Sequence, residues 1–208
     1  MTVKLLLVSD LHGSGRALSW IRECIAEHNP DVVLIAGDLT HFGPPGFVDE
    51  IATLLGRILA VNGNCDTAAV VNRMHALGIS AIDRLVALGD AIIVGIGWPV
   101  GDSALRRIPQ SLREKVMSHA LSPLPKIVLS HSPALGYLDE PSAGHHIGSR
   151  ALLEFIRVLE PELVLTGHVH EAPGIIEGRT VIVNPGPAKE MRACSAEVEK
   201  GGARVQPL

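Results

Sequence analysis

The sequence predicts an α/β fold in which mixed β-sheet packs against helices. Short aliphatic runs recur along the 208-residue chain, helical patterns stand between several of them, and aromatic residues make up only 3% of the sequence. Short continuous aliphatic runs suit strands that are buried on both faces, and their alternation with helices is typical of α/β proteins. The core must therefore consist mainly of Leu, Ile, Val and Ala.

The expected elements follow from these patterns in chain order. The aliphatic runs predict strands over residues 4–8, 32–36, 58–61, 91–96, 127–129, 163–165 and 181–183. Apolar residues at helical spacing predict helices over residues 17–27, 48–59, 68–77, 105–121 and 149–159. Ser149 is placed to cap the last of these helices, because a Ser side chain can accept a hydrogen bond from the first helical turn.

The C-terminal part of the chain has the pattern of two hairpins. Residues 174–181 turn around Glu177-Gly178, and the segments 196–199 and 203–205 flank Lys200-Gly201-Gly202. Antiparallel strands are therefore expected late in the chain, which makes the sheet mixed. The sequence contains no linker, repeat or low-complexity segment, so we expect residues 1–208 to form a single domain.

Charge and cysteine content exclude several classes of protein. The formal net charge is -4, and the small basic cluster of Arg106, Arg107, Arg113 and Lys115 is interpreted as a solvated helix face, so duplex nucleic acid is not an expected partner. Three cysteines without a CxxC pair argue against a disulfide scaffold. The first apolar run is too short for a signal peptide, and no segment is long enough to cross a membrane. We expect a cytoplasmic protein with no membrane contact, either monomeric or homo-oligomeric.

Polar residues follow five of the predicted strands directly. They are Asp10 and His12, Asp38, Asn64, His131, and His168 and His170. Ligands of open α/β sheets bind beyond the carboxyl ends of the strands, so these residues are expected to converge. In extended chain, residues two apart point to the same side, which would aim both members of the Asp-x-His and His-x-His pairs at one point. The neighbouring glycines Gly37, Gly63 and Gly167 would let the backbone pass close to a crowded site.

These seven side chains make a recognisable donor set. Four imidazoles, two carboxylates and one amide oxygen, with no thiolate, suit Mn, Fe, Zn, Co or Ni better than Ca or Mg. The set is too large for one ion and fits two if one carboxylate bridges. Taken singly, an Asp at a strand end, a lone His131 or an Asn64 in a turn would have an ordinary structural role. Together they predict two divalent transition-metal ions, with Mn as the first choice.

The order of these motifs resembles the calcineurin-like metallophosphoesterase superfamily. Its Asp-x-His, Gly-Asp, Gly-Asn, lone His and Gly-His-x-His pieces match the seven residues in order, and Asn184-Pro185-Gly186 is similar to its closing segment. The resemblance implies a four-layer α/β/β/α sandwich of two mixed β-sheets flanked by helices. It also implies one ion on Asp10, His12, Asp38 and His170, and a second on Asp38, Asn64, His131 and His168, with Asp38 bridging.

The resemblance further implies a hydrolase of small-molecule phosphate esters, with phosphodiesters favoured. The two ions would lower the pKa of a water toward ~7, and the resulting hydroxide would attack phosphorus. Many members have His where Cys65 stands, and Cys there is similar to a subgroup of small bacterial and archaeal phosphodiesterases. Cys65 is interpreted as a packed neighbour of the site and Asp66 as an orienting residue.

The catalytic residues and the class of activity stay partly open at this stage. Asn64 and His131 are expected to act in catalysis as well as in metal binding, and His41, His145 or His146 could protonate the leaving group. Trp98, in the loop 97–102, either walls the substrate pocket or packs in a surface turn. The alternatives to a small-ester hydrolase are a nuclease, which the short acidic chain disfavours, and a non-catalytic scaffold like the retromer subunit of this fold, which the complete donor set disfavours.

Overall fold

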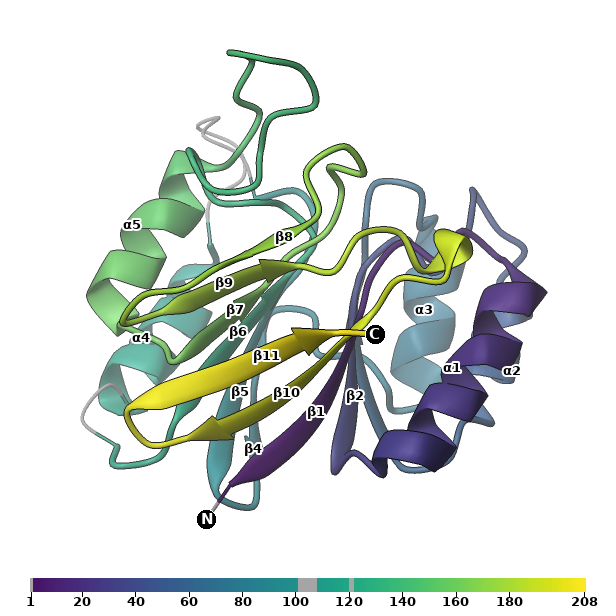
Figure 1. Cartoon of the computed structure of the whole chain (residues 1–208), viewed down its shortest axis with the longest axis horizontal. Helices are drawn as coiled ribbons and strands as arrows, with labels where there is room; N and C mark the ends of the chain where they lie inside the picture. Colours follow the sequence, from purple (N-terminus) through teal and green to yellow (C-terminus); the bar gives the residue numbers. More distant parts are fainter. Residues whose placement is uncertain (1, 101–107, 120–121) are drawn as a thin grey trace.

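The computed structural model describes residues 2–100, 108–119 and 122–208. Its strands form two sheets (Figure 1). The first has the order β11-β10-β1-β2-β3, with bounds Gly202–Pro207, Cys194–Glu199, Val3–Val8, Val32–Ala36 and Arg57–Val61. The second has the order β4-β5-β6-β7-β9-β8, with bounds Arg84–Leu88, Ala91–Ile96, Lys126–Ser130, Leu163–Leu165, Val181–Asn184 and Gly174–Ile176.

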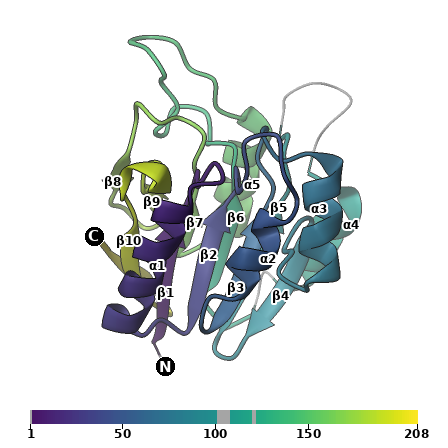
Figure 2. The same ribbon diagram turned by 90° about the vertical axis from the view of Figure 1, so that its right-hand side faces the viewer.

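Helices cover the outer face of each sheet (Figures 1 and 2). Three of them, α1 (Gly15–His28), α2 (Phe47–Ala52) and α3 (Ala68–Ala76), share a hydrophobic core with the first sheet. The helices α4 (Gln110–His119) and α5 (Arg150–Leu159) share another core with the second sheet. A third core lies between the two sheets. The predicted four-layer α/β/β/α sandwich is therefore confirmed.

The aliphatic runs form strands because each has two buried faces to fill. In β1, Leu6 and Val8 belong to the core under the helices, whereas Leu5 and Leu7 belong to the core between the sheets. Successive side chains of a strand point to opposite faces, so an unbroken aliphatic run supplies both cores at once.

The central strands of both sheets run parallel to one another. Strands β1, β2 and β3 pair in parallel, and so do β5, β6, β7 and β9. The antiparallel strands lie toward the edges: β10 and β11 in the first sheet, β4 and β8 in the second. Both late hairpins are confirmed, as is the mixed character of the sheets. The parallel order also brings the carboxyl ends of the central strands to a common edge within each sheet.

Local capping explains where the strongest helices begin and end. The side chain of Ser14 accepts a hydrogen bond from Ala17 N, and Asn29 ends α1 in the left-handed conformation. Ser149 caps α5 by accepting from Leu152 N, as predicted. Side-chain caps of this kind satisfy amide groups that have no partner inside the helix.

Two expectations about the elements are corrected. The predicted helix 48–59 is wrong in its second half, because α2 ends at Ala52 and β3 begins at Arg57 after Gly56, whose φ is +91°. Strand β4 has no counterpart among the predicted runs. The predicted helix 105–121 corresponds to α4, with 105–107 and 120–121 outside the described residues. Of the basic cluster, Arg113 and Lys115 are exposed on α4, and the other two members also lie outside the described residues.

Two further features bear on the expected class of protein. Cys24, Cys65 and Cys194 are all buried and carry free thiols. Across the described ranges, no helix combines the length and apolar character needed to cross a bilayer.

Candidate metal centre

The seven predicted donor residues follow strands of both sheets. Asp10 and His12 come after β1, Asp38 after β2 and Asn64 after β3 in the first sheet; His131 comes after β6, and His168 and His170 after β7, in the second. Asp10, Asp38 and His131 are almost fully buried. Donors that are distant in sequence thus meet where the two sheets face each other.

One group of donors forms around His12. Its Nε2 lies 3.8 Å from Asp10 Oδ1, 3.7 Å from Asp38 Oδ2 and 3.3 Å from Nε2 of His170. The His170 Nε2 is in turn 3.2 Å from Asp10 Oδ1. Although buried, Asp10 Oδ1 makes no hydrogen bond within the described residues. A buried carboxylate oxygen without a donor, facing two imidazole nitrogens, fits a cation that binds all of them.

A second group forms around His131. Its Nε2 lies 3.6 Å from Asp38 Oδ1 and 3.0 Å from Asn64 Oδ1. Its other nitrogen, Nδ1, is 2.8 Å from the Ala36 carbonyl oxygen. This carbonyl can only accept a hydrogen bond, so Nδ1 carries the proton and Nε2 presents its lone pair, as metal-binding imidazoles do. The two oxygens of Asp38 therefore face different donor groups.

His168 joins the second group through ring contacts. Its ring centroid lies 5.0 Å from that of His131, and its backbone N donates a hydrogen bond to Asp10 Oδ2. Burial, followed by the repulsion that a protonated His131 would exert, lowers the pKa of His168 to about 4. The imidazole is then neutral at neutral pH, which is the form that binds metal.

Burial and contacts with carboxylates shift the pKa values of the imidazoles in the first group in opposite directions. Burial is the largest influence on His12 and lowers its pKa. For His170 the contact with Asp10 outweighs burial and raises the pKa. For Asp10, burial alone would raise the pKa, but His170, His131 and Ser9 together lower it, so this carboxylate stays ionised.

The backbone that presents these donors is not extended. Asp10, His12, Asp38 and His168 have φ values of 55°, 48°, 48° and 72°. These angles lie in the left-handed region, which is costly for residues with a side chain. We expected an extended backbone to point both members of each donor pair, Asp-x-His and His-x-His, to the same side. That expectation is wrong, although the side chains do converge. Strained turns place them, and such strain is typical of functional sites.

Two glycines permit this close packing. A Cβ added at Gly63 would overlap Asp38 Oδ1, and one added at Gly167 would overlap Ser9 Oγ. The first contact would displace the donor residue Asp38, and the second would displace Ser9, which is the neighbour of the donor residue Asp10. Only glycine can therefore occupy these positions without moving the site, in line with the sequence-based expectation for both of them.

Residues around the donors hold them in place. The single hydroxyl proton of Ser9 is shared between two acceptors, Asp10 Oδ2 and the Ala36 carbonyl. Asp66 accepts hydrogen bonds from the backbone N of Leu39, Thr40 and Gly63, which ties the ends of β2 and β3 together. Asn184 donates to the carbonyls of Val169 and Ala172 and so fixes the His-x-His turn. The orienting role expected for Asp66 matches these contacts.

Trp98 packs against the second donor group. Its ring centroid is 5.4 Å from that of His131 and 4.7 Å from that of His168. The backbone around Trp98 is fixed by Asn62, whose side chain bonds both its N and its O. Trp98 therefore packs down beside the donor residues, a position that the pocket-wall alternative requires. Residues 101 and 102 of its loop lie outside the described residues.

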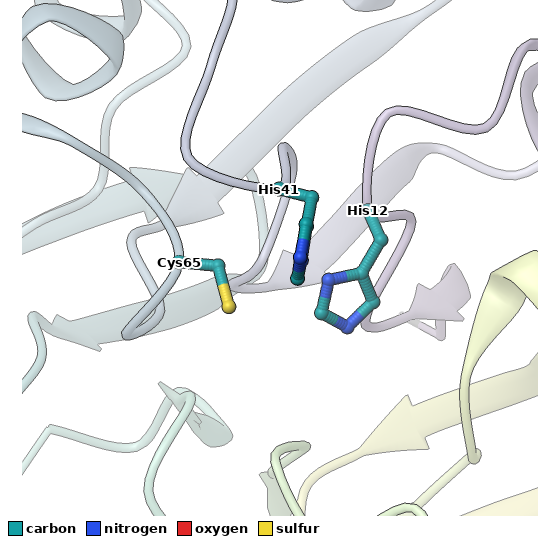
Figure 3. A group of neighbouring side chains, drawn as sticks. All are labelled: His12, His41 and Cys65. Atoms are coloured by element: carbon teal, nitrogen blue, oxygen red, sulfur yellow. The ribbon is translucent and has the colours of Figure 1, made fainter.

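The candidate proton donors fall in different places. His41 lies beside the first donor group, with its ring centroid 5.5 Å from that of His12, and Figure 3 shows both rings close to Cys65. His146 instead contacts two carboxylates of its own loop, Asp139 at 2.8 Å and Glu140 at 3.3 Å. The neighbouring His145 is exposed. The structure thus brings His41, and not His146, against a donor residue.

Sequence reasoning did not single out Lys189. This residue lies in the 3-10 helix Ala188–Glu190, and its backbone N donates a 3.3 Å hydrogen bond to the Asp10 carbonyl. Its positive charge acts to lower the pKa of both His12 and His170. The signal that could have found it is its position three residues after the Asn184-Pro185-Gly186 segment.

Comparisons with known proteins bear on the family and on the fold. The family described as Calcineurin-like phosphoesterase matches residues 3–172. An uncharacterized protein of Methanocaldococcus jannaschii is 26% identical over 199 residues, covering 89% of this chain and 88% of that protein. A Thermus thermophilus structure has a TM-score of 0.74 at 14% identity, covering 99% of both chains. A structure described as a novel archaeal phosphodiesterase has a TM-score of 0.57 at 17% identity, also covering 99% of both chains.

Proposed function

This chain belongs to the calcineurin-like phosphoesterase family, whose members are metal-dependent hydrolases of phosphate esters, and we propose that it hydrolyses small phosphodiesters with two divalent ions. The observation that carries the proposal is the placement of Asp38. One of its carboxylate oxygens faces His12 at 3.7 Å and the other faces His131 at 3.6 Å. A carboxylate with a separate donor group on each side suits a bridge between two ions.

The donor chemistry supports this assignment. Asp10, His12, Asp38 and His170 would hold one ion, and Asp38, Asn64, His131 and His168 the other. Bound there, the ions would supply a water of lowered pKa, toward ~7, and would offset the charge of the phosphate. Nitrogen and oxygen donors without sulfur favour Mn, with Fe, Zn, Ni or Co as the other choices.

The remaining residues have defined tasks in this proposal. Trp98 covers one side of His131 and His168 and keeps bulk water away from them. His41 is exposed beside His12, where it can give a proton to the departing oxygen of the ester. Lys189 adds a positive charge near His12 and His170, which favours binding of an anionic phosphate.

Cys65 supports a preference for diesters. Burial, followed by the hydrogen bond to Asp38, raises the pKa of its thiol to about 12, so at neutral pH it stays uncharged. A monoester is a dianion, and an uncharged thiol offers its second negative charge no counterion. A diester carries one charge and needs less compensation.

Hydrolysis of model substrates tests the proposal. Chelator-treated enzyme would be assayed with bis-p-nitrophenyl phosphate and p-nitrophenyl phosphate after addition of Mn²⁺, Ni²⁺, Zn²⁺ or Mg²⁺. We expect activity only after a metal is added, with a higher kcat/KM for the diester. Preference for the monoester would contradict the diester assignment, and no hydrolysis with any ion would favour a scaffold. A submicromolar, strongly salt-dependent affinity for duplex DNA would favour a nuclease.

A further inference from the structure

Three groups of neighbouring His, Cys or acidic side chains in the described residues have ligand atoms close enough for one ion. Two of them, Asp10 with His12 and His170, and Asp10 with Asp38 and His131, fall within the proposed pair of ions. The third consists of His12, His41 and Cys65, whose ligand atoms lie within 4.8 Å of one another (Figure 3). This third group shares only His12 with the pair.

The imidazole of His12 faces both places. Its Nε2 lies toward Asp10, Asp38 and His170. Figure 3 shows the other ring nitrogen, Nδ1, on the side of His41 and Cys65. Nδ1 is buried and has no hydrogen-bond partner among the described residues. A buried ring nitrogen without a partner is unfavourable unless something binds it, and the space it faces holds two further potential ligands.

Cys65 is an uncharged thiol as long as no ion is bound, and the Asn64 amide is placed to support the thiolate that a bound ion would create. The Asn64 amide turns its oxygen to His131, at 3.0 Å, so that its nitrogen donates a hydrogen bond to Cys65 Sγ, at 3.2 Å. Hydrogen bonds donated to sulfur stabilise a thiolate that binds metal, and such supporting contacts orient the ligand as well. The same side chain thus serves the proposed pair through its oxygen and Cys65 through its nitrogen.

The geometry points to an accessory site in which His12 Nδ1, His41 and Cys65 Sγ bind a third divalent ion of the zinc class. Two imidazoles and one thiolate, with an open position for water, form a donor set that Zn²⁺ uses in proteins. Ideal tetrahedral binding places such donors roughly 3.5 Å apart. His41 is exposed, so its side chain can close the remaining distance.

The two kinds of site would select different ions. The proposed pair has only nitrogen and oxygen donors and accepts Mn, whereas a thiolate favours softer ions such as Zn²⁺ and discriminates against Mn and Mg. On binding, the ion takes the place of the thiol proton of Cys65 and of the Nδ1 proton that His12 carries while its Nε2 binds the neighbouring ion, and both protons are released to solvent. The accessory ion therefore adds to a Mn-loaded pair, and its binding does not depend on any phosphate substrate. While the ion is bound, His41 is a ligand and cannot give a proton to the leaving group, so the proposed hydrolysis requires an empty accessory site.

Cobalt titration of the Mn-loaded, full-length enzyme tests this site, because Co²⁺ is a spectroscopic substitute for zinc. We expect one further ion per chain together with a sulfur-to-cobalt charge-transfer band in the near ultraviolet. Cys65→Ser should remove the band, and His41→Ala should weaken the third-ion affinity at least about tenfold, with the Mn content retained in both. Cobalt that merely replaces Mn in the pair gives no such band, because the pair contains no sulfur.

Cys24→Ser is the matched control, because Cys24 is a buried cysteine on α1 that belongs to none of the three groups. Its band and third-ion affinity should equal those of the wild type. Absence of the band in the wild-type protein, or a band that persists in Cys65→Ser, would overturn the accessory site. The His41→Ala variant changes an exposed residue, so its result stands even if Cys65→Ser fails to fold. Because the band is read without substrate, failure of the proposed hydrolysis would leave this result unaffected.

Discussion

Asp38 is the residue on which both donor groups depend. Its side chain is 3% exposed, its two oxygens face His12 and His131, and Oδ1 also accepts a hydrogen bond from Cys65 N. With φ at 48°, the residue also sits in a strained backbone conformation. Strain and burial of an acidic side chain persist only where the surroundings compensate them, which two cations would do.

Asp38→Asn should abolish most of the activity. The amide keeps the size of the side chain and one acceptor oxygen, but it lacks the negative charge and the second oxygen that a bridge between ions requires. We expect kcat/KM for bis-p-nitrophenyl phosphate to fall at least about 10³-fold, or about 4 kcal/mol of barrier, with loss of at least one bound ion. Activity assays and metal analysis of the same preparation would measure both.

Asp90→Asn is the control for this variant. Asp90 precedes β5 at the end of that strand remote from the site, so the change removes the same charge without touching a donor. Its activity and metal content should match the wild type. Full activity of Asp38→Asn at an unchanged metal content would refute the bridging role.

Cys65→His should shift preference toward monoesters. A protonated imidazole would supply a positive charge and a proton donor, and both favour a dianionic monoester more than a monoanionic diester. We expect the ratio of kcat/KM for p-nitrophenyl phosphate to that for the diester to rise at least about tenfold, or about 1.4 kcal/mol. Cys65→Gln brings a side chain of related size without the charge. An equal rise in that variant would show that shape, and not the proton, sets the preference.

At the scale of elements, the turns that follow the strands determine the geometry of the site. Sequence position alone predicted which residues converge, because polar residues directly after aliphatic runs must lie at strand ends. The left-handed turns at Asp10, His12 and His168 could not be predicted in this way. Left-handed conformation in a non-glycine residue runs against local preference, so it is imposed by tertiary contacts such as those of Ser9 and Asn184.

The elements that sequence reasoning missed have weak local signals. Strand β4 is a half-exposed edge strand whose aliphatic run covers only residues 85–88, and only Gly89 and Asp90 separate it from the longer run of β5. The predicted helix 48–59 is too long because Leu54 and Leu55 continue the helical spacing of apolar residues as far as the start of β3. The chain instead breaks there, and Leu55 is 76% exposed. Helices α1 and α5, with clear caps and long apolar faces, were predictable.

The loop between β6 and α5 contains a pH-sensitive contact. Asp139 is buried and accepts hydrogen bonds from the backbone N of Gly136 and Gly148, and it also pairs with His146. Contact with Asp139 raises the pKa of His146 above 6.5, whereas the pKa of Asp139 is lowered. The pair is therefore charged on both sides in mildly acidic solution and loses the charge of His146 as the pH rises.

His146→Gln should lower the melting temperature at low pH only. A raised pKa in the folded state stabilises the fold below the unfolded value of 6.5, and this contribution disappears as the pH rises through the folded-state pKa. Thermal unfolding at about pH 5.5 and about pH 9 would measure the difference. His75→Gln, at an exposed position on α3, is the control and should show no such trend. A loss of equal size at both pH values would mean that the charge of His146 is irrelevant.

For the whole molecule, the donor residues connect the two halves of the sandwich. Asp10, Asp38 and Asn64 follow strands of the first sheet, whereas His131, His168 and His170 follow strands of the second. Away from these donors, an aliphatic core lies between the two sheets. Composition could predict that such a core exists but not that the chain divides its strands between two sheets, because each aliphatic run fits either sheet equally well.

Binding of Mn²⁺ should therefore stabilise the whole domain. Ions that bind residues of both sheets have no comparable site in the unfolded chain, so by mass action each ion at 100 times its Kd adds about 2.7 kcal/mol to the free energy of unfolding. For a chain of this length that corresponds to a rise in Tm of at least about 5 °C. Calorimetry of chelator-treated protein with and without Mn²⁺ would measure it, and Mg²⁺ should act more weakly because it binds imidazole poorly. Asp38→Asn should lose most of the rise and Asp90→Asn should keep it. An equal rise in Asp38→Asn would show that Mn²⁺ stabilises the protein from some other place, and the two sheets would then not be joined through these seven residues.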